Sequence, residues 1–135
     1  MKNKDRAEPR YPGSHEATSR RETVLRPRFR LTSGKDIAFG PGKADLLERI
    51  AESGSITRAA AGMGMSYMRA WTLIQRMNQS FKEPVVEAAH GGRRHGGAKL
   101  TPAGIAALKL YRRMEAKSLK AVQADWRKLQ KLLRD

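Results

Sequence analysis

The stretch GSITRAAAGMGMSYMRAWTLIQRMN (residues 54–78) contains two helix-forming runs that meet around Gly64. Ser55 and Ser66 stand where the two runs begin. Serine is favoured at a helix start because its side-chain oxygen accepts a hydrogen bond from a free backbone N–H. Gly64 tolerates the positive φ that a tight turn between helices requires. A short helix, a tight turn and a longer amphipathic helix predict a helix-turn-helix, although an ordinary corner between two core helices has the same pattern.

The longer helix, predicted from Ser66 onward, carries apolar side chains at intervals of three or four residues. Such spacing indicates that one face of the helix is directed at a core. We expect Trp71, Ile74 and Met77 to face inward. The positions that then face outward, and could meet a partner, include Ser66, Tyr67, Arg69, Thr72 and Arg76.

Two elements are predicted before this motif. Residues 28–39 alternate charged and apolar side chains, a pattern typical of a short strand, and the turn-forming residues at 33–36 predict that it folds back on itself. Residues 43–54 place apolar side chains at helical spacing and end at Gly54, a favourable residue just after a helix. The helix-turn-helix is therefore expected to pack against a further helix.

A β-wing is predicted after the motif. Pro84 excludes helix, and the β-branched Val85 and Val86 begin one strand, while residues 98–101 make a second. Between them the glycines of HGGRRHGG frame a basic tip that is too cationic to bury. Guanidinium groups at such a tip are suited to phosphates or a minor groove. The basic side chains of the wing are Arg93, Arg94, His95 and Lys99.

The last helix begins at Thr101 and Pro102, which suit the N-cap and the first helical position. We expect it to continue to the end of the chain. Its later part predicts a two-heptad apolar seam that packs on a partner subunit or on its own domain. We assign dimerisation to this seam, which consists of Leu119, Val122, Trp126, Leu129 and Leu133.

The predicted fold class is mainly α with a small β-wing. Residues 28–101 form the winged helix-turn-helix, and residues 102–135 form one long C-terminal helix. Residues 1–27 are rich in charge, Pro, Gly and Ser, so they predict a basic disordered arm. A role of this arm in DNA binding and a simple solvated tail remain equal alternatives.

The composition points to a polyanionic partner. The chain of 135 residues has 28 Lys and Arg against 13 Asp and Glu, a formal net charge of +15. Such an excess favours nucleic acid, with an acidic membrane surface as the second choice. Without cysteine, neither a disulfide nor a Cys-based zinc site can form. With no long apolar run and no secretory signal pattern, we expect a soluble protein of the cytoplasm.

Residues from about 28 to 121 resemble the DNA-binding half of ModE-type bacterial regulators, whose helix-turn-helix is related to that of LysR-type regulators. The resemblance is carried by ESGSITRAAAGMGMSYMRAWTLIQRMN and VVEAAHGGRRHGGAKLTPAG. It implies a winged helix used as a homodimer that binds double-stranded DNA. ModE proteins also carry a β-rich region that binds molybdate. No β-rich segment follows the last predicted helix before Asp135, so we expect no molybdate site here.

Within this interpretation, Arg69 is the predicted base reader, because Arg can donate two hydrogen bonds to guanine. Tyr67 and Thr72 are expected to meet a thymine methyl group or a phosphate, and Arg76 the DNA backbone. Simple helix capping is the alternative for Ser55, and a solvated loop is the alternative for the wing tip. A phosphate anchor is predicted at the start of the preceding helix, from Ser55, Thr57 and Arg58.

Three other functions have weaker support. Glu87, His90 and His95 have a spacing that could hold a metal, but they lie on a Gly-rich segment that offers no rigid frame. With no phosphate-binding loop or catalytic triad pattern, we predict neither an enzyme nor a cofactor. A non-specific nucleoid-type or accessory DNA-binding protein is the main alternative to a sequence-specific regulator. A membrane role for the last helix is disfavoured, because its apolar residues form a packing seam.

Overall fold

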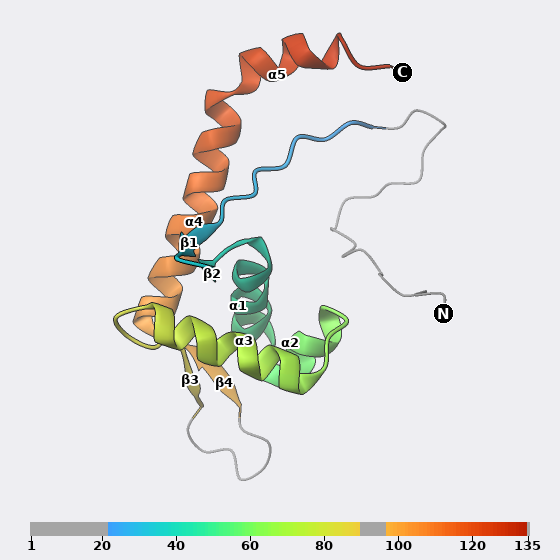
Figure 1. Cartoon of the computed structure of the whole chain (residues 1–135). Helices are drawn as coiled ribbons and strands as arrows, with labels where there is room; N and C mark the ends of the chain where they lie inside the picture. The colour runs from blue at the N-terminus through green and yellow to red at the C-terminus, as the bar shows by residue number, and fades with distance from the viewer. Residues whose placement is uncertain (1–21, 90–96, 135) are drawn as a thin grey trace.

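The computed structural model describes residues 22–89 and 97–134 (Figure 1). Two antiparallel hairpins, β1–β2 and β3–β4, accompany a mainly helical chain in this part, which confirms the predicted fold class. The elements follow in the order β1 (Leu31–Ser33), β2 (Asp36–Phe39), α1 (Pro41–Ser53), α2 (Ile56–Gly62), α3 (Tyr67–Ser80), β3 (Val86–Ala88), β4 (Ala98–Leu100), α4 (Pro102–Ala121) and α5 (Gln123–Gln130).

The first hairpin has the turn that the sequence predicts. Ser33 pairs with Asp36 across the turn, and Gly34 adopts a φ of 62°, a conformation that glycine reaches without steric cost. β2 then delivers Phe39 into the core, where its side chain is 1% exposed. Pro41 follows as the first residue of α1, where its missing N–H costs nothing.

Each helix end in the helix-turn-helix is capped by hydrogen bonds between residues that lie within one turn of each other. The N–H of Gly54 donates to the carbonyl of Ile50 at 2.8 Å and closes α1 with a φ of 67°. Ser55 Oγ accepts from the N–H of Arg58 at 3.2 Å and starts α2. Ser66 begins α3 in the same way, and Gly64 turns the chain between them with a φ of 66°. The predicted motif is confirmed.

One core joins the helix-turn-helix to the first half of α4. The ring of Phe39 packs edge-on against Phe81 and Tyr111, with centroids 5.6 Å and 5.2 Å away. The hydroxyl of Tyr111 also donates to the carbonyl of Phe29 at 2.8 Å. The segment before β1 is therefore tied to α4. The largest fully buried side chains are Tyr111, Phe39, Leu46, Leu47, Ile50, Met77 and Val85.

The side chain of Asn78 anchors the wing to α3. Its Oδ1 accepts from the N–H groups of Val85 at 2.8 Å and Val86 at 3.3 Å, and its Nδ2 donates to the Val86 carbonyl at 3.2 Å. At the other end of the wing, Thr101 caps α4 by accepting from the N–H of Gly104 at 3.0 Å. These contacts fix where β3 and β4 project below α3 (Figure 1).

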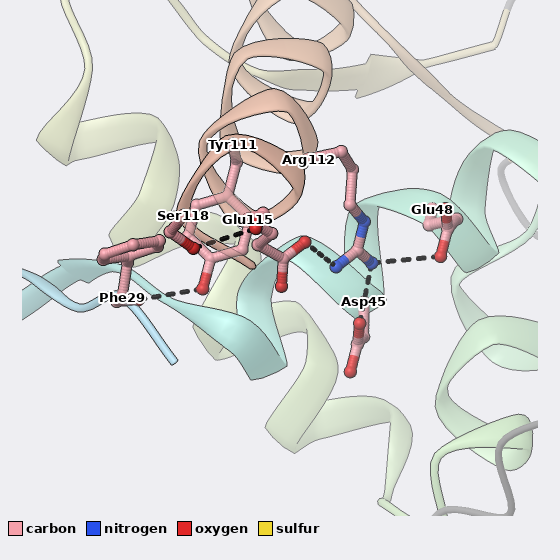
Figure 2. A network of polar contacts seen from close by, with 7 residues as sticks. All are labelled: Phe29, Asp45, Glu48, Tyr111, Arg112, Glu115 and Ser118. Carbon is pink, nitrogen blue, oxygen red and sulfur yellow. Dashed lines mark hydrogen bonds and ion pairs between the residues drawn. The ribbon is translucent and has the colours of Figure 1, made fainter. Parts of the chain in front are cut away.

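Arg112 holds α4 against α1, as Figure 2 shows. Its guanidinium donates to Asp45 at 2.7 Å and Glu48 at 3.0 Å on α1, and to Glu115 at 2.9 Å on its own helix. Burial lowers the pKa of Arg112, but the hydrogen bonds to Asp45 and Glu115 outweigh it and raise that pKa above its ordinary value. One cation facing three carboxylates thus sets the position of α4 on the domain.

The expectation of a single helix from Pro102 to the chain end was wrong. The helix stops at Ala121, Val122 adopts φ −100° and ψ 4°, and α5 starts at Gln123. Figure 1 shows α5 turned away from the direction of α4. Valine is a weaker helix former than the residues around it, and within residues 112–134 no buried side chain holds the helix straight.

Candidate nucleic-acid interface

The outer face of α3 is the centre of the candidate interface. Ala70, Ile74 and Met77 are buried, which confirms the inward positions predicted for Ile74 and Met77. The inward position predicted for Trp71 was wrong, because its side chain is 42% exposed. The buried stripe passes through Ala70, and the next residue points about 100° away from it around the helix. Trp71 therefore lies on the flank that faces solvent.

The polar residues predicted on α3 occupy exposed or half-buried positions. Arg69 and Arg76 are exposed, and so is Tyr67. The oxygen of Ser66 is already engaged as the cap of α3, accepting from the N–H of Arg69 at 3.1 Å. Thr72 is half-buried, and its hydroxyl donates to the carbonyl of Met68 at 2.8 Å. Both hydroxyls thus have intrahelical partners, whereas Arg69 keeps its guanidinium at the surface near the start of the helix.

At the start of α2 the cap residue is half-buried, whereas the two side chains after Ile56 are exposed. Ser55 is half-buried, and its Oγ caps the helix as the sequence predicts, while a phosphate contact of this residue stays a prediction. Its N–H donates to Ser53 Oγ at 3.3 Å, and its backbone bridges to Gly97 next to the wing. Thr57 and Arg58 are exposed beside it. These two side chains remain open to a phosphate, and that contact stays a prediction.

Only the base of the predicted wing surface lies in the described residues. Lys99 on β4 faces Glu87 directly across the hairpin, and its ammonium lies 3.7 Å from the Glu87 carboxylate. Both side chains are about half exposed, so this ion pair is weak and leaves the Lys99 ammonium accessible to solvent. The other predicted wing residues lie outside the described residues, and so does His90: they are Arg93, Arg94 and His95.

Lys43 is a candidate that the sequence did not indicate. Burial lowers its pKa, the positive charge of Arg76 lowers it further, and Asp36 partly opposes the shift. Its Nζ donates to the carbonyl of Ile37. The first turn of α1 and the middle of α3 therefore bring two cations within electrostatic range. No spacing along the chain reveals this, because the two residues come from separate helices. A bound phosphate would relieve the repulsion between them.

The residues of the predicted seam are incompletely covered. Leu119 and Trp126 are half-buried, whereas Val122 is 40%, Leu129 50% and Leu133 44% exposed. The seam spans the bend at Val122, and its last residue lies beyond the end of α5. A continuous heptad stripe is thus replaced by apolar side chains on two helices that meet at an angle.

Two negative findings apply to the described part of the chain. Within residues 22–89 and 97–134, no three His, Asp or Glu side chains gather as they would around a metal ion. None of the described helices combines the length and the apolar character needed to cross a bilayer.

The likeness to known proteins falls on the region just described. Residues 43–105 match the family described as "Bacterial regulatory helix-turn-helix protein, lysR family". "Molybdenum-pterin-binding protein MopB" of Rhodobacter capsulatus is 45% identical over 78 residues, which are 58% of this chain and 29% of that protein. The "DNA-binding transcriptional dual regulator ModE" of Escherichia coli strain K12 is 45% identical over 71 residues, 53% of this chain and 27% of that protein.

A "Molybdenum transport protein ModE" of Azotobacter vinelandii is 39% identical over 88 residues, 65% of this chain and 33% of that protein. The matched part of the chain thus spans about a third or less of the length of each of these relatives. The match covers nearly all of α1, the whole of α2 and α3, and both strands of the wing. The match supports the predicted resemblance of residues 43–105 to the helix-turn-helix domains of LysR- and ModE-type regulators.

Proposed function

We propose that this chain binds double-stranded DNA through its helix-turn-helix and acts as a transcriptional regulator. The observation that supports this most directly is the exposed first half of α3, with Arg69 at the surface just after the turn. In a helix-turn-helix, this helix enters the major groove and its first residues reach the base edges. The net charge of +15 supplies the attraction to phosphates.

Arg69 is the residue to which we assign base reading. It is exposed, and no carboxylate within the described residues forms a salt bridge with it. An unpaired guanidinium can donate two parallel hydrogen bonds to O6 and N7 of guanine. Tyr67 and Thr72 line the same helix, and Ser66 places the helix start against the DNA.

Phosphate contacts would surround this reading helix. Arg76 on α3 and Lys43 on α1 repel each other, and a phosphate bound between them would offset this repulsion. Ser55 can still donate its hydroxyl hydrogen, and Thr57 and Arg58 are exposed beside it. On the other side we assign backbone or minor-groove contacts to the wing residues Arg93, Arg94, His95 and Lys99.

We further propose that the regulator is a homodimer. Two half-sites one helical turn apart require two reading helices in a fixed relation. The apolar side chains of Val122, Leu129 and Leu133 are 40–50% exposed in the single chain, and a second copy would cover them. With Leu119 and Trp126 they form the proposed dimer surface.

The test is a salt series of binding to a selected and to a random duplex, with Arg69→Ala beside the wild type. We expect the selected duplex to bind about 10³-fold tighter or more. Removing a bidentate contact to guanine should reduce that preference by about ten- to a hundredfold, corresponding to roughly 1–3 kcal/mol. Arg113→Ala is the matched control, because it removes an exposed arginine from α4, outside the proposed interface.

The control variant should keep the wild-type preference. If the wild type binds every duplex alike, with only a steep dependence on salt, the assignment of α3 as a reading helix fails. The chain would then be a non-specific, nucleoid-type or accessory DNA-binding protein. If Arg113→Ala loses the preference as fully as Arg69→Ala, overall charge and not Arg69 carries the selectivity.

A further inference from the structure

Three large side chains on the first two turns of α3 are exposed, although none of them is charged. Tyr67 is 47%, Met68 63% and Trp71 42% exposed. We call these residues the α3 patch. Exposed apolar residues are common singly, but two aromatic rings and a methionine gathered on one helix indicate a surface that is covered in use.

The three side chains lie next to one another. Trp71 follows Met68 by three residues and Tyr67 by four, and residues at these intervals are neighbours on a helix surface. Among the described residues, the side chains of these three make no ring contact and no hydrogen bond. Part of the Trp71 indole is therefore open to whatever approaches α3.

The position of the α3 patch identifies its occupant. It begins one residue after the Ser66 cap, and Met68 lies about 80° from Arg76 and about 100° from Arg69 around the helix. A partner that covers Met68 therefore also meets exposed cations. The exposed apolar residues of α5 lie at the far end of the molecule from the start of α3 (Figure 1). The patch is thus separate from the proposed dimer surface and continuous with the proposed DNA surface.

The major groove offers one apolar group on its base edges, the 5-methyl group of thymine. We infer that the α3 patch selects thymine in each half-site, with Trp71 packing on the methyl group and Met68 covering its side. Arginine reads guanine by hydrogen bonds, whereas this patch reads thymine by excluding water from its methyl group. This inference rests on the proposed function, since it requires α3 to enter the major groove.

The experiment replaces thymine by deoxyuridine, which removes only the methyl group. A duplex is first selected from random sequence, and its thymines are then exchanged one at a time. For the wild type we expect about fourfold weaker binding at each contacted thymine, the effect of one buried methyl-sized group. Trp71→Ala should bind the two forms of the duplex equally. The comparison is a double-mutant cycle between one side chain and one methyl group.

Leu110→Ala is the matched control, because it removes an apolar side chain that is 57% exposed on α4. This variant should keep the wild-type response to deoxyuridine. Circular dichroism will check that Trp71→Ala keeps its helices. The uridine series on the wild type alone tests the inference even if that variant does not fold.

The outcomes separate the inference from the proposed function. If the wild type selects no sequence, the proposed function fails. If it selects a sequence but no thymine in it responds to loss of its methyl group, the inference is overturned while the proposed function stands. The inference is also overturned if Trp71→Ala folds and responds to deoxyuridine as the wild type does.

Discussion

The residues up to Tyr111 and those that follow it differ in what covers their apolar side chains. In the first region Leu46, Leu47 and Ile50 are 0% exposed, enclosed by α1–α3, the wing and the start of α4. In the second, no residue of 112–134 is buried, and Leu132 is 81% exposed. Both regions are helical, so helix formation alone does not tell which one supports the fold.

The difference shows where the free energy of folding arises. Packed apolar surface stabilises the first region within one chain. α5 has eight residues, too few to be stable as an isolated helix in water. A second surface that covers the apolar side chains of α5 would stabilise this helix when the protein is assembled. Substitutions in the first region should therefore change mainly the free energy of unfolding, and substitutions in the second should change mainly the affinity for a partner.

The largest expected effect follows from removing a buried leucine. Leu47→Ala should lower the free energy of unfolding by about 3 kcal/mol, through lost apolar burial and the cavity that remains. Leu132→Ala, the same change in the second region, should stay within about 0.5 kcal/mol because little surface is lost. Urea unfolding followed by circular dichroism measures both. Equal losses from the two variants would contradict the division of the chain at Tyr111.

The next largest loss of stability is expected where the backbone of α4 closely approaches that of the segment before β3. A Cβ built on Gly104 would lie 2.1 Å from the carbonyl oxygen of Val85, so Gly104→Ala must push α4 away from the strand. We expect a loss of about 2 kcal/mol, typical of overpacking. Gly42→Ala is the control, since a Cβ on Gly42 meets nothing within 4 Å. That variant should be neutral or slightly stabilising. If Gly104→Ala proves equally neutral, α4 does not sit this close to the wing.

The local features were the ones that the sequence predicted well. Ser55, Ser66 and Thr101 each cap a helix, and Gly64 turns the chain, because these effects act over three or four neighbouring residues. The hairpin before α1 is equally local. Because these local signals all favour the same fold, the winged helix-turn-helix was predictable from the sequence.

Several features that sequence reasoning missed depend on how separate parts of the chain pack together. Trp71 was misplaced because the small Ala70, and not the large indole, packs against the core. The repulsion between Lys43 and Arg76 and the three carboxylates around Arg112 arise only where separate helices come together. Spacing along one helix carries no information about either. The DNA contacts stay predictions, because they depend on a partner molecule as well as on this chain.

The dimer surface gives the third prediction. Trp126→Ala should raise the dissociation constant of the homodimer by about tenfold, since it removes the largest apolar side chain of the seam from its contact with the second copy. Its effect on unfolding measured at low protein concentration should be small, because Trp126 is not part of the core. Sedimentation equilibrium measures the first quantity. A wild type that stays monomeric at high concentration would contradict the proposed dimer.

The smallest expected effect concerns Tyr111, the residue at which the two regions meet. Burial raises its pKa, and the negative charge of Glu115 raises it further. A tyrosine whose pKa is higher in the folded state contributes its full stability below about pH 10, the ordinary value, and loses it as the pH rises through the folded value. At pH 8, Tyr111→Phe should be about 1 kcal/mol less stable than the wild type, because it lacks the hydrogen bond to the carbonyl of Phe29.

Above pH 10 this difference should narrow, since ionisation of the unfolded wild type costs it up to about 1.4 kcal/mol of stability per pH unit while the variant has no such group. Urea unfolding of both proteins at pH 8 and pH 11 measures the change, and other titrating groups cancel in the comparison. A difference that stays constant between the two pH values would mean that the hydroxyl of Tyr111 ionises as freely in the folded chain as in the unfolded one. The junction at Tyr111 would then be open to water, and the first region would end before it.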